Sequence, residues 1–400
     1  MFKISKRNRE IKYAIGDVTL KANKLKEQGK KILYLNTGDP IKYDFDVLEE
    51  LKIGLCKAIE NGYNFYGQSE GEVDVREAIV FKERVFNHVN IDKDFVFVSN
   101  GVSDVFLMVS SVLFENGEEI LIPGPSYPIY ITYPKLFGGK PIEYKCDESN
   151  NWQPDLEDIE RKISDKTIAI VLINPNNPTG AIYDEKILKQ IVDIAKAHNL
   201  LVIADEIYDH NVFEGEFKSI GSIIHDYPIL VLNGISKSYL ATGWRFGYGY
   251  IVNPDDNSRE FIEAIRRILR ARISPVTPIE EAAKHLFLKE PLNMTEINDK
   301  LRKRRDLMYE RFNEIEGFSV VKPKGALYMF PKINFKILNK WRNDVEFVYD
   351  LLDKTGVLTV FGSGFGIYGK DHLRIVFLPN EDTINEAMDK IEKFVKSNNS

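Results

Sequence analysis

Cysteine and histidine are scarce in this 400-residue sequence, and their scarcity argues against two classes of protein. The two cysteines, Cys56 and Cys146, lie far apart, and no pair among the six histidines has the spacing of a zinc site. A disulfide-stabilised secreted protein and a metalloenzyme are therefore both disfavoured. We expect reduced thiols, a cytoplasmic location and no metal centre.

Long apolar runs and basic clusters are also lacking. No apolar stretch approaches the roughly 20 residues that a membrane helix needs, and residues 1–12 have no apolar core of the kind found in secretory signals. Lysine and arginine total 54 against 60 acidic residues, a formal net charge of −6. The most basic stretch, Arg266–Arg272, is interleaved with apolar residues, as in a helix with one solvated face. We expect neither a membrane nor a nucleic acid as a partner.

The middle of the chain alternates short apolar runs with amphipathic stretches, within a composition that is 44% hydrophobic and 28% charged. Five continuous apolar runs predict buried strands at Phe95–Ser99, Glu119–Ile122, Ile168–Ile173, Leu200–Ala204 and Ile229–Leu232. Between two of them, Asp184 has the character of an N-cap, and helical spacing continues to about His198. This βαβ order predicts an α/β domain with a mostly parallel sheet.

The C-terminal third has a different pattern. Helical spacing over Pro291–Ile315 leads into short apolar runs, and two further helices are predicted at Val345–Lys354 and from Glu381 onward, with a strand at His372–Phe377 between them. We interpret this region as a smaller α+β domain. The predicted organisation is an N-terminal segment (1–50) that contributes to the small domain and a substrate loop, a large domain (51–295) and a small domain (296–400).

Polar clusters follow three successive predicted strands. They are Asn174–Gly180, Asp205–Tyr208 and Asn233–Lys237, with Arg245 a few residues further on. Ligands collect at the carboxyl ends of parallel strands, so these side chains should meet one ligand.

The residue types in these clusters suit a cofactor that carries a pyridine ring, a phenolic oxygen, an aldehyde and a phosphate. The amine of Lys237 can form a Schiff base with the aldehyde, and the carboxylate of Asp205 can keep the pyridine nitrogen protonated. An amide and a phenol can bond the ring oxygen, and Arg245 can hold the phosphate. Each residue alone is commonplace in a chain with 54 basic and 60 acidic residues. Their joint occurrence at strand ends carries the prediction.

The motifs Asn-Pro-x-Asn-Pro-Thr-Gly, Asp-Glu-x-Tyr and Ser-Lys-x-x-x-x-x-Gly-x-Arg resemble those of the class I aminotransferases of fold type I, which depend on pyridoxal 5'-phosphate. The resemblance implies a large domain with a mostly parallel seven-stranded sheet and a smaller α+β domain. It implies that Lys237 binds the cofactor and acts as the catalytic base, and that Asp205 pairs with the pyridine nitrogen. Asn177 and Tyr208 would contact the ring oxygen, and Arg245 the phosphate.

The same resemblance assigns roles to further residues. The assigned cofactor contacts are Gly101, Val102 and Ser103 at a helix start, Ser236, and Tyr127 stacked on the ring. Tyr66 would reach the phosphate of a partner subunit, which implies a homodimer with shared active sites. The assigned substrate contacts are Gly38, Tyr13, Asn177 and Arg374, of which Arg374 would bind the α-carboxylate.

Two positions bear on the substrate. Gly234 stands where aspartate aminotransferases usually carry a phosphate-binding serine, and Asn-Gly-x-Ser-Lys resembles the branch with the bacterial and archaeal alanine aminotransferases. That branch often has an arginine where this chain has Gly16, and recognition of glutamate's distal carboxylate therefore stays open. The leading hypothesis is amino transfer between L-alanine and 2-oxoglutarate by a ping-pong mechanism.

Other functions stay open at this point. They are an aspartate, aromatic or branched-chain aminotransferase, a pyridoxal-phosphate-dependent carbon–sulfur lyase, and a regulator that binds the cofactor without turnover. The regulator is disfavoured because the chain has a complete set of catalytic and binding groups: Lys237, Asp205, Asn177, Tyr208, Arg245 and Arg374.

Overall fold

The fold is built on one large sheet, seen in a computed structural model that describes residues 2–9, 11, 13–289 and 294–398. The eight strands of the sheet, in spatial order, are β2 (Val96–Ser99), β9 (Gly247–Val252), β8 (Ile229–Gly234), β7 (Leu201–Asp205), β6 (Thr167–Ile173), β3 (Glu119–Gly124), β4 (Lys140–Asp147) and β5 (Gln153–Pro154). Neighbouring strands from β8 to β4 are parallel, whereas β9 and β5 run antiparallel to their neighbours.

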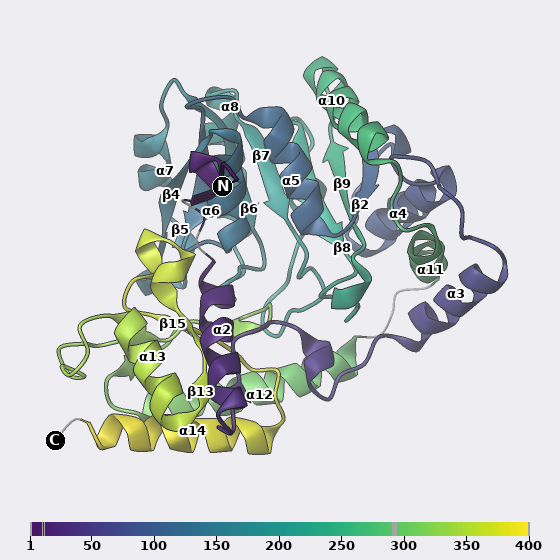
Figure 1. Cartoon of the computed structure of the whole chain (residues 1–400). Coiled ribbons are helices and arrows are strands. Elements are labelled where there is room, and N and C mark those ends of the chain that lie inside the picture. The colour runs from purple at the N-terminus through teal and green to yellow at the C-terminus, as the bar shows by residue number, and fades with distance from the viewer. Residues whose placement is uncertain (1, 10, 12, 290–293, 399–400) are drawn as a thin grey trace.

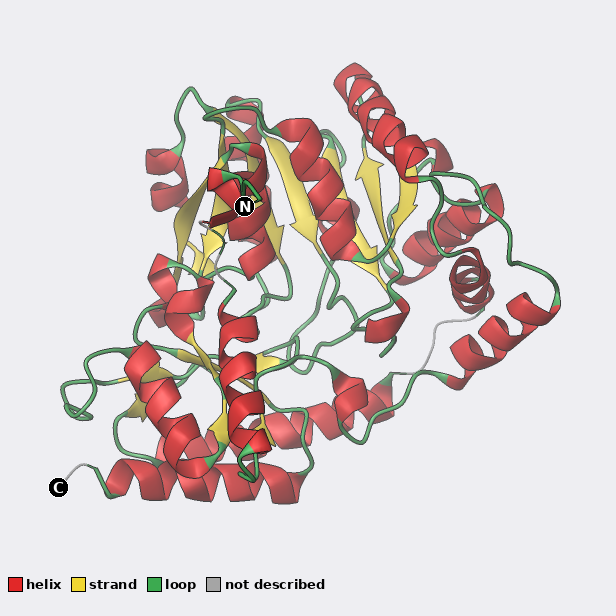
Figure 2. Cartoon of the chain, viewed as in Figure 1, coloured by secondary structure: helices red, strands yellow, loops and turns green. Residues whose placement is uncertain are grey.

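Helices cover both faces of this sheet (Figure 2). They are α3 (Glu49–Glu60), α4 (Val73–Phe86), α5 (Val102–Leu113), α6 (Pro128–Phe137), α7 (Leu156–Lys162), α8 (Glu185–Ala197), α9 (Ile220–Ile223), α10 (Asp256–Arg272) and α11 (Thr277–Phe287). The central strands β6, β7 and β8 are almost entirely buried, which explains their continuous apolar sequences.

A second group of elements lies at the end of the molecule that contains the C-terminus (Figure 1). Its helices are α2 (Ala14–Glu27), α12 (Thr295–Glu314), α13 (Asp344–Thr355) and α14 (Glu381–Lys396), and α1 (Lys6–Arg9) precedes them in the chain. Its short strands are β1 (Leu33–Tyr34) paired with β13 (Val357–Leu358), β10 (Phe318–Ser319) paired with β12 (Lys332–Ile333), and β11 (Tyr328–Met329), β15 (Leu373–Val376) and β14 (Val360–Phe361) in one sheet. An N-terminal strand thus pairs with a C-terminal one. The division at residue 295 stays a prediction.

The predicted fold class is confirmed, and the five predicted strands are present with ends shifted by one or two residues. The sheet has eight strands where seven were expected, because the two-residue strand β5 extends its edge. Strand β9 lacked a continuous apolar run because Gly247 and Gly249 interrupt it. A side chain at Gly249 would collide with the Phe97 ring on β2.

The predicted helix at Asp184 is confirmed as α8, although the Asp184 side chain makes no capping hydrogen bond. Part of the predicted helix at Pro291–Ile315 lies outside the described residues, and the described helix α12 begins at Thr295. Both cysteines are free, as expected. Over the described part of the chain, every helix is too short or too polar to pass through a membrane.

Candidate active site

A cavity of about 170 Å³ opens where β6, β7 and β8 end. That volume is roughly ten times what one water molecule needs, enough for an organic ring. Nine residues predicted from the sequence line it: Val102, Ser103, Tyr127, Asn177, Asp205, Tyr208, Ser236, Lys237 and Arg245. The other lining residues are Ile129, Ile173, Ile207, Thr242 and Tyr328. The three polar clusters therefore meet, as the order of the strands predicted.

Lys237 projects its amine into this cavity from the turn that follows β8. Its Nζ donates a hydrogen bond of 2.5 Å to the carbonyl oxygen of Gly38, in the loop after β1. Gly38 has no room for a side chain, because a Cβ there would lie 2.1 Å from the Tyr328 hydroxyl. The glycine thus lets its backbone approach the cavity lysine closely.

Asp205, the last residue of β7, has a buried carboxylate at the cavity. Oδ2 accepts a hydrogen bond of 2.7 Å from the Tyr130 hydroxyl, and Oδ1 accepts one of 3.2 Å from the Ile207 backbone N–H. Burial raises the pKa of Asp205 from 3.8 to about 6, and these hydrogen bonds and the charge of Lys237 only partly oppose that effect. A positively charged group placed beside this carboxylate would therefore stabilise its buried charge.

Tyr208 reaches the cavity from the turn after β7, and its hydroxyl lies 2.8 Å from that of Tyr328 on β11. The two rings meet edge to face, with centroids 5.8 Å apart. Burial raises the pKa of Tyr208 well above its ordinary value, so the phenol stays protonated and can donate a hydrogen bond.

Arg374 lies on β15 behind the cavity with 2% of its surface exposed. Its guanidinium donates to Asn177 Oδ1 at 3.2 Å and to the Asn36 carbonyl at 2.6 Å, while its Nε has no hydrogen-bond partner among the described residues. The group is sandwiched between the rings of Tyr328 and Phe365, with centroids 4.5 and 4.7 Å away. A buried guanidinium with a free donor is suited to bind a carboxylate.

Arg245 and the start of α5 form the other end of the cavity. The Arg245 guanidinium donates to the carbonyls of Thr242 and Asn100, at 3.0 and 3.2 Å, and lies 3.5 Å from Ser236 Oγ. Gly101, the N-cap of α5, has a φ of 86°, and a Cβ there would lie 2.5 Å from Arg245 Nη2. The backbone N–H groups of a helix start beside a guanidinium are suited to bind an anion.

Five predicted site residues lie outside the lining: Gly38, Gly101 and Arg374, described above, and Tyr13 and Tyr66. Tyr13 is 39% exposed and lies close enough to the buried Tyr127 to help raise the pKa of that phenol above its ordinary value, although burial is the main cause. Gly234, the position without the phosphate-binding serine, has no room for a side chain, because a Cβ would come 2.6 Å from the carbonyl oxygen of Phe246, the residue before β9. Tyr66 is 82% exposed and takes no part in this cavity, so its predicted role toward a partner stays a prediction.

Tyr130, Tyr328, Thr242 and Ile129 were not predicted from the sequence. Each belongs to an ordinary apolar or turn segment, and the chain contains 19 tyrosines. The only available signal was the position of Ile129 and Tyr130 directly after Tyr127 in the sequence.

The sequence matches a family model, described as aminotransferase class I and II, over residues 30–391. The chain belongs to this family. It is therefore an enzyme that depends on pyridoxal 5'-phosphate and uses amino acids and 2-oxo acids as substrates.

Several relatives share nearly the whole chain. It is 36% identical to an alanine aminotransferase of Mycobacterium tuberculosis, over 99% of this chain and 93% of that protein. It is also 36% identical to the glutamate-pyruvate aminotransferase AlaA of Escherichia coli K12, over 95% of this chain and 94% of that one. A solved structure of an alanine aminotransferase from Pyrococcus furiosus is similar with a TM-score of 0.96 and 48% identity, covering 99% of this chain and all of the other.

The residues of this aminotransferase fit the cofactor. The cavity presents one primary amine, a buried carboxylate, an amide and a protonated phenol, and its far end is an anion site. A Cβ at Gly101 would push into Arg245 at that end. These groups match the aldehyde, the pyridine nitrogen, the phenolic oxygen and the phosphate of pyridoxal phosphate.

Proposed function

We propose that this aminotransferase exchanges the amino group between L-alanine and 2-oxoglutarate in two half-reactions. The observation that carries the proposal is the 48% identity, over nearly the whole chain, to the alanine aminotransferase of Pyrococcus furiosus. The names of the Mycobacterium and Escherichia coli relatives point the same way. The free thiols of Cys56 and Cys146 support a cytoplasmic location.

Different cavity residues would bind different parts of the cofactor. Lys237 would bind its aldehyde carbon, Asp205 its pyridine nitrogen, and Asn177 with Tyr208 its phenolic oxygen. The phosphate would be held by Arg245, Ser236 and the helix start at Gly101, Val102 and Ser103, and Tyr127 would cover the ring. When bound, the cofactor supplies a carbon that accepts the amino group and a ring that withdraws electrons from the substrate.

Arg374 would orient the substrate through its α-carboxylate. Its free Nε and the hydrogen bond it makes to Asn177 support this role. With the carboxylate fixed, the amine of Lys237 would remove the proton from the α-carbon of the amino donor, and in the second half-reaction it would supply a proton to the α-carbon of the 2-oxo acid. Gly38 and Tyr13 would close the site from the N-terminal side, where they contact Lys237 and Tyr127.

The substrate proposal is tested by the visible absorption of the purified enzyme loaded with pyridoxal phosphate. L-Alanine is expected to remove the band of the lysine-bound cofactor, because the amino group passes to the cofactor. Subsequent 2-oxoglutarate is expected to restore that band and release glutamate. D-Alanine, which presents the opposite face to Arg374, is the matched control and should leave the band unchanged.

Other outcomes assign other substrates. A band that ignores L-alanine but responds to aspartate, aromatic or branched-chain amino acids would overturn the alanine proposal and keep the aminotransferase. Pyruvate and ammonia released from a cysteine conjugate without any 2-oxo acid would point to carbon–sulfur lyase activity. Restoration by 2-oxo acids other than 2-oxoglutarate would redefine the acceptor, consistent with the absence of an arginine at Gly16.

We propose further that two copies of the chain share their active sites. The exposed Tyr66, together with the exposed Phe65 and Ile59 nearby, supports a surface that a second copy covers. Tyr66 would then reach the phosphate site of the partner subunit.

Mixing two inactive variants tests this arrangement. Tyr66→Ala is expected to weaken cofactor affinity by about 10- to 100-fold, the effect of losing a hydrogen bond to a charged group. At limiting cofactor, dimers that combine Tyr66→Ala with Lys237→Ala chains contain one intact site, and activity should return to about a quarter of wild type when subunits mix at random. Mixed dimers that stay inactive, or a monomer in light scattering, would contradict the proposal.

A further inference from the structure

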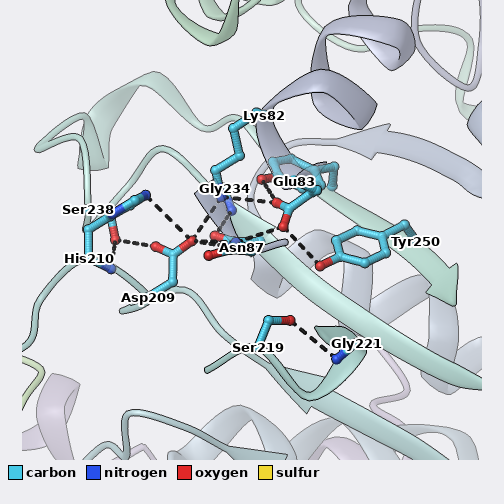
Figure 3. A network of polar contacts seen from close by, with 12 residues as sticks. Lys82, Glu83, Asn87, Asp209, His210, Ser219, Gly221, Gly234, Ser238 and Tyr250 are labelled. Atoms are coloured by element: carbon cyan, nitrogen blue, oxygen red, sulfur yellow. Dashed lines mark hydrogen bonds and ion pairs between the residues drawn. The ribbon is translucent and has the colours of Figure 1, made fainter. Parts of the chain in front are cut away.

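A buried polar network adjoins the cavity and has no part in the roles described so far (Figure 3). The ammonium of Lys82, on α4, lies 2.8 Å from Asp209 Oδ2 and 3.0 Å from Glu83 Oε1. None of these three side chains has any exposed surface. Because buried charges are costly unless they are paired, the network must hold its geometry tightly.

Asp209 connects this network to the active site through its hydrogen bond with Ser238, the residue after Lys237. Its Oδ2 accepts hydrogen bonds from Lys82, Asn87 and Asn233, at 2.8, 3.2 and 2.8 Å, and its Oδ1 accepts one of 2.7 Å from Ser238 Oγ. These donors belong to α4 and its C-cap, to β8, and to the turn beyond β8. A single carboxylate therefore fixes three segments relative to one another.

Ser238 connects Asp209 to the backbone on both sides of Tyr208, which lines the cavity. Its Oγ accepts a hydrogen bond of 3.3 Å from the backbone N–H of His210 and lies 3.3 Å from the Ile207 carbonyl. Tyr208 stands between these two backbone positions, and Lys237 directly precedes Ser238. The one hydroxyl thus joins the turn that carries Tyr208 to the turn that carries Lys237.

The charges in the network strengthen the hydrogen bonds that Asp209 accepts. Burial alone would raise the pKa of Asp209, but the charge of Lys82 and the hydrogen bonds from Lys82 and Ser238 outweigh burial and lower it below its ordinary value. Burial likewise opposes the charge of Lys82, whose pKa is nevertheless raised by Asp209 and Glu83. Asp209 is therefore ionised, and hydrogen bonds to an ionised acceptor are shorter and stronger than neutral ones.

We propose that Ser238 and Asp209 are positioning residues for amino transfer, which set the Lys237 amine relative to the Tyr208 hydroxyl. The proposal rests on the role proposed for Lys237. Its physical basis is that proton transfer requires the base within hydrogen-bonding distance of the reacting carbon. A displacement of 1 Å there can cost about 100-fold in rate.

The test compares two variants that each remove one hydroxyl from this network. Ser238→Ala removes the hydrogen bond to Asp209, and Tyr250→Phe removes one of 3.0 Å to Glu83 at the other end, on β9. Both hydroxyls are buried, so similar losses in melting temperature are expected. In single-turnover experiments with the best amino donor, Ser238→Ala should slow transfer about tenfold or more, and Tyr250→Phe less than about twofold.

A spectroscopic reading separates positioning from loss of stability. The pH at which the visible band of the lysine-bound cofactor changes should shift in Ser238→Ala and stay unchanged in Tyr250→Phe. Rates are expressed per bound cofactor, so partial unfolding does not affect them. Asp209→Asn, which keeps the shape of the side chain but weakens the acceptor, provides a second variant and should slow transfer in the same direction.

The outcomes distinguish this proposal from the proposed function. If Lys237→Ala retains near wild-type transfer, the assigned role of Lys237 fails. If Lys237→Ala is inactive, but Ser238→Ala and Asp209→Asn match Tyr250→Phe in rate and spectrum, the positioning proposal is wrong. Slower transfer and a shifted spectrum in both test variants, with neither change in Tyr250→Phe, would support it.

Discussion

Lys237→Ala is expected to lower the rate of amino transfer by about 10⁴-fold or more, the upper range for a group that moves a proton at the reacting carbon. The substitution removes the amine that faces the cavity and leaves Asp205, Tyr208 and Arg245 in place. The fold and part of the cofactor affinity should therefore persist. The measurement is the rate of the half-reaction with L-alanine, together with the visible spectrum and the melting temperature.

Lys189→Ala makes the same chemical change on the surface of α8, where the lysine pairs with Glu185. This control should keep the rate and spectrum of the wild type. Near wild-type transfer by Lys237→Ala would contradict the assignment of the catalytic base, whatever its melting temperature.

Asp205→Asn is expected to have two opposite effects. Transfer should fall by about 10²- to 10³-fold, since a neutral amide no longer stabilises positive charge on the pyridine nitrogen. The cofactor-free protein should nevertheless become more stable at neutral pH, because the substitution removes a buried charge whose hydrogen-bond donors among the described residues, Tyr130 and the Ile207 N–H, are both neutral. This combination would identify a carboxylate that is retained for function at the expense of stability.

The pH dependence gives the sign and the size of the stability effect. The pKa of the Asp205 carboxyl is raised from 3.8 to about 6 in the folded protein, so folding favours its protonated form. The wild type therefore loses stability as the pH rises from about 4 to about 6, and the loss is complete above that range. It amounts to at most about 3 kcal/mol, from 1.36 kcal/mol per pKa unit.

Thermal unfolding of the cofactor-free proteins at pH 5.0 and 7.5 measures this effect. The stability gained by Asp205→Asn should be larger at pH 7.5. Glu206→Gln is the matched control, because Glu206 is the next residue, is equally buried and has its pKa raised by burial to about 8. That variant should also be stabilised but should retain amino transfer. An Asp205→Asn protein that is destabilised equally at both pH values would refute the charge-burial account.

The sequence carried most of the information about fold and cofactor. Buried parallel strands have continuous apolar sequences, and β6, β7 and β8 could therefore be predicted. Because such strands end at one edge, the clusters that follow them had to meet, and Asn177, Asp205 and Lys237 do line one cavity. Strand β9 was missed because its glycines, which its neighbours require, break the apolar run.

Only the tertiary structure decided which ordinary side chains complete the site. Tyr130 and Tyr328 come from α6 and β11, far in sequence from the residues they bond, and no local pattern separates them from the other tyrosines. Lys82 is an unremarkable helix residue until folding places it beside Asp209, 127 positions later in the chain. Local sequence determines which strands form and which groups stand at their ends, because periodicity and turn chemistry act over a few residues. Burial and contact between distant segments determine the pKa values and positions of the side chains in the site. Both exist only in the folded protein.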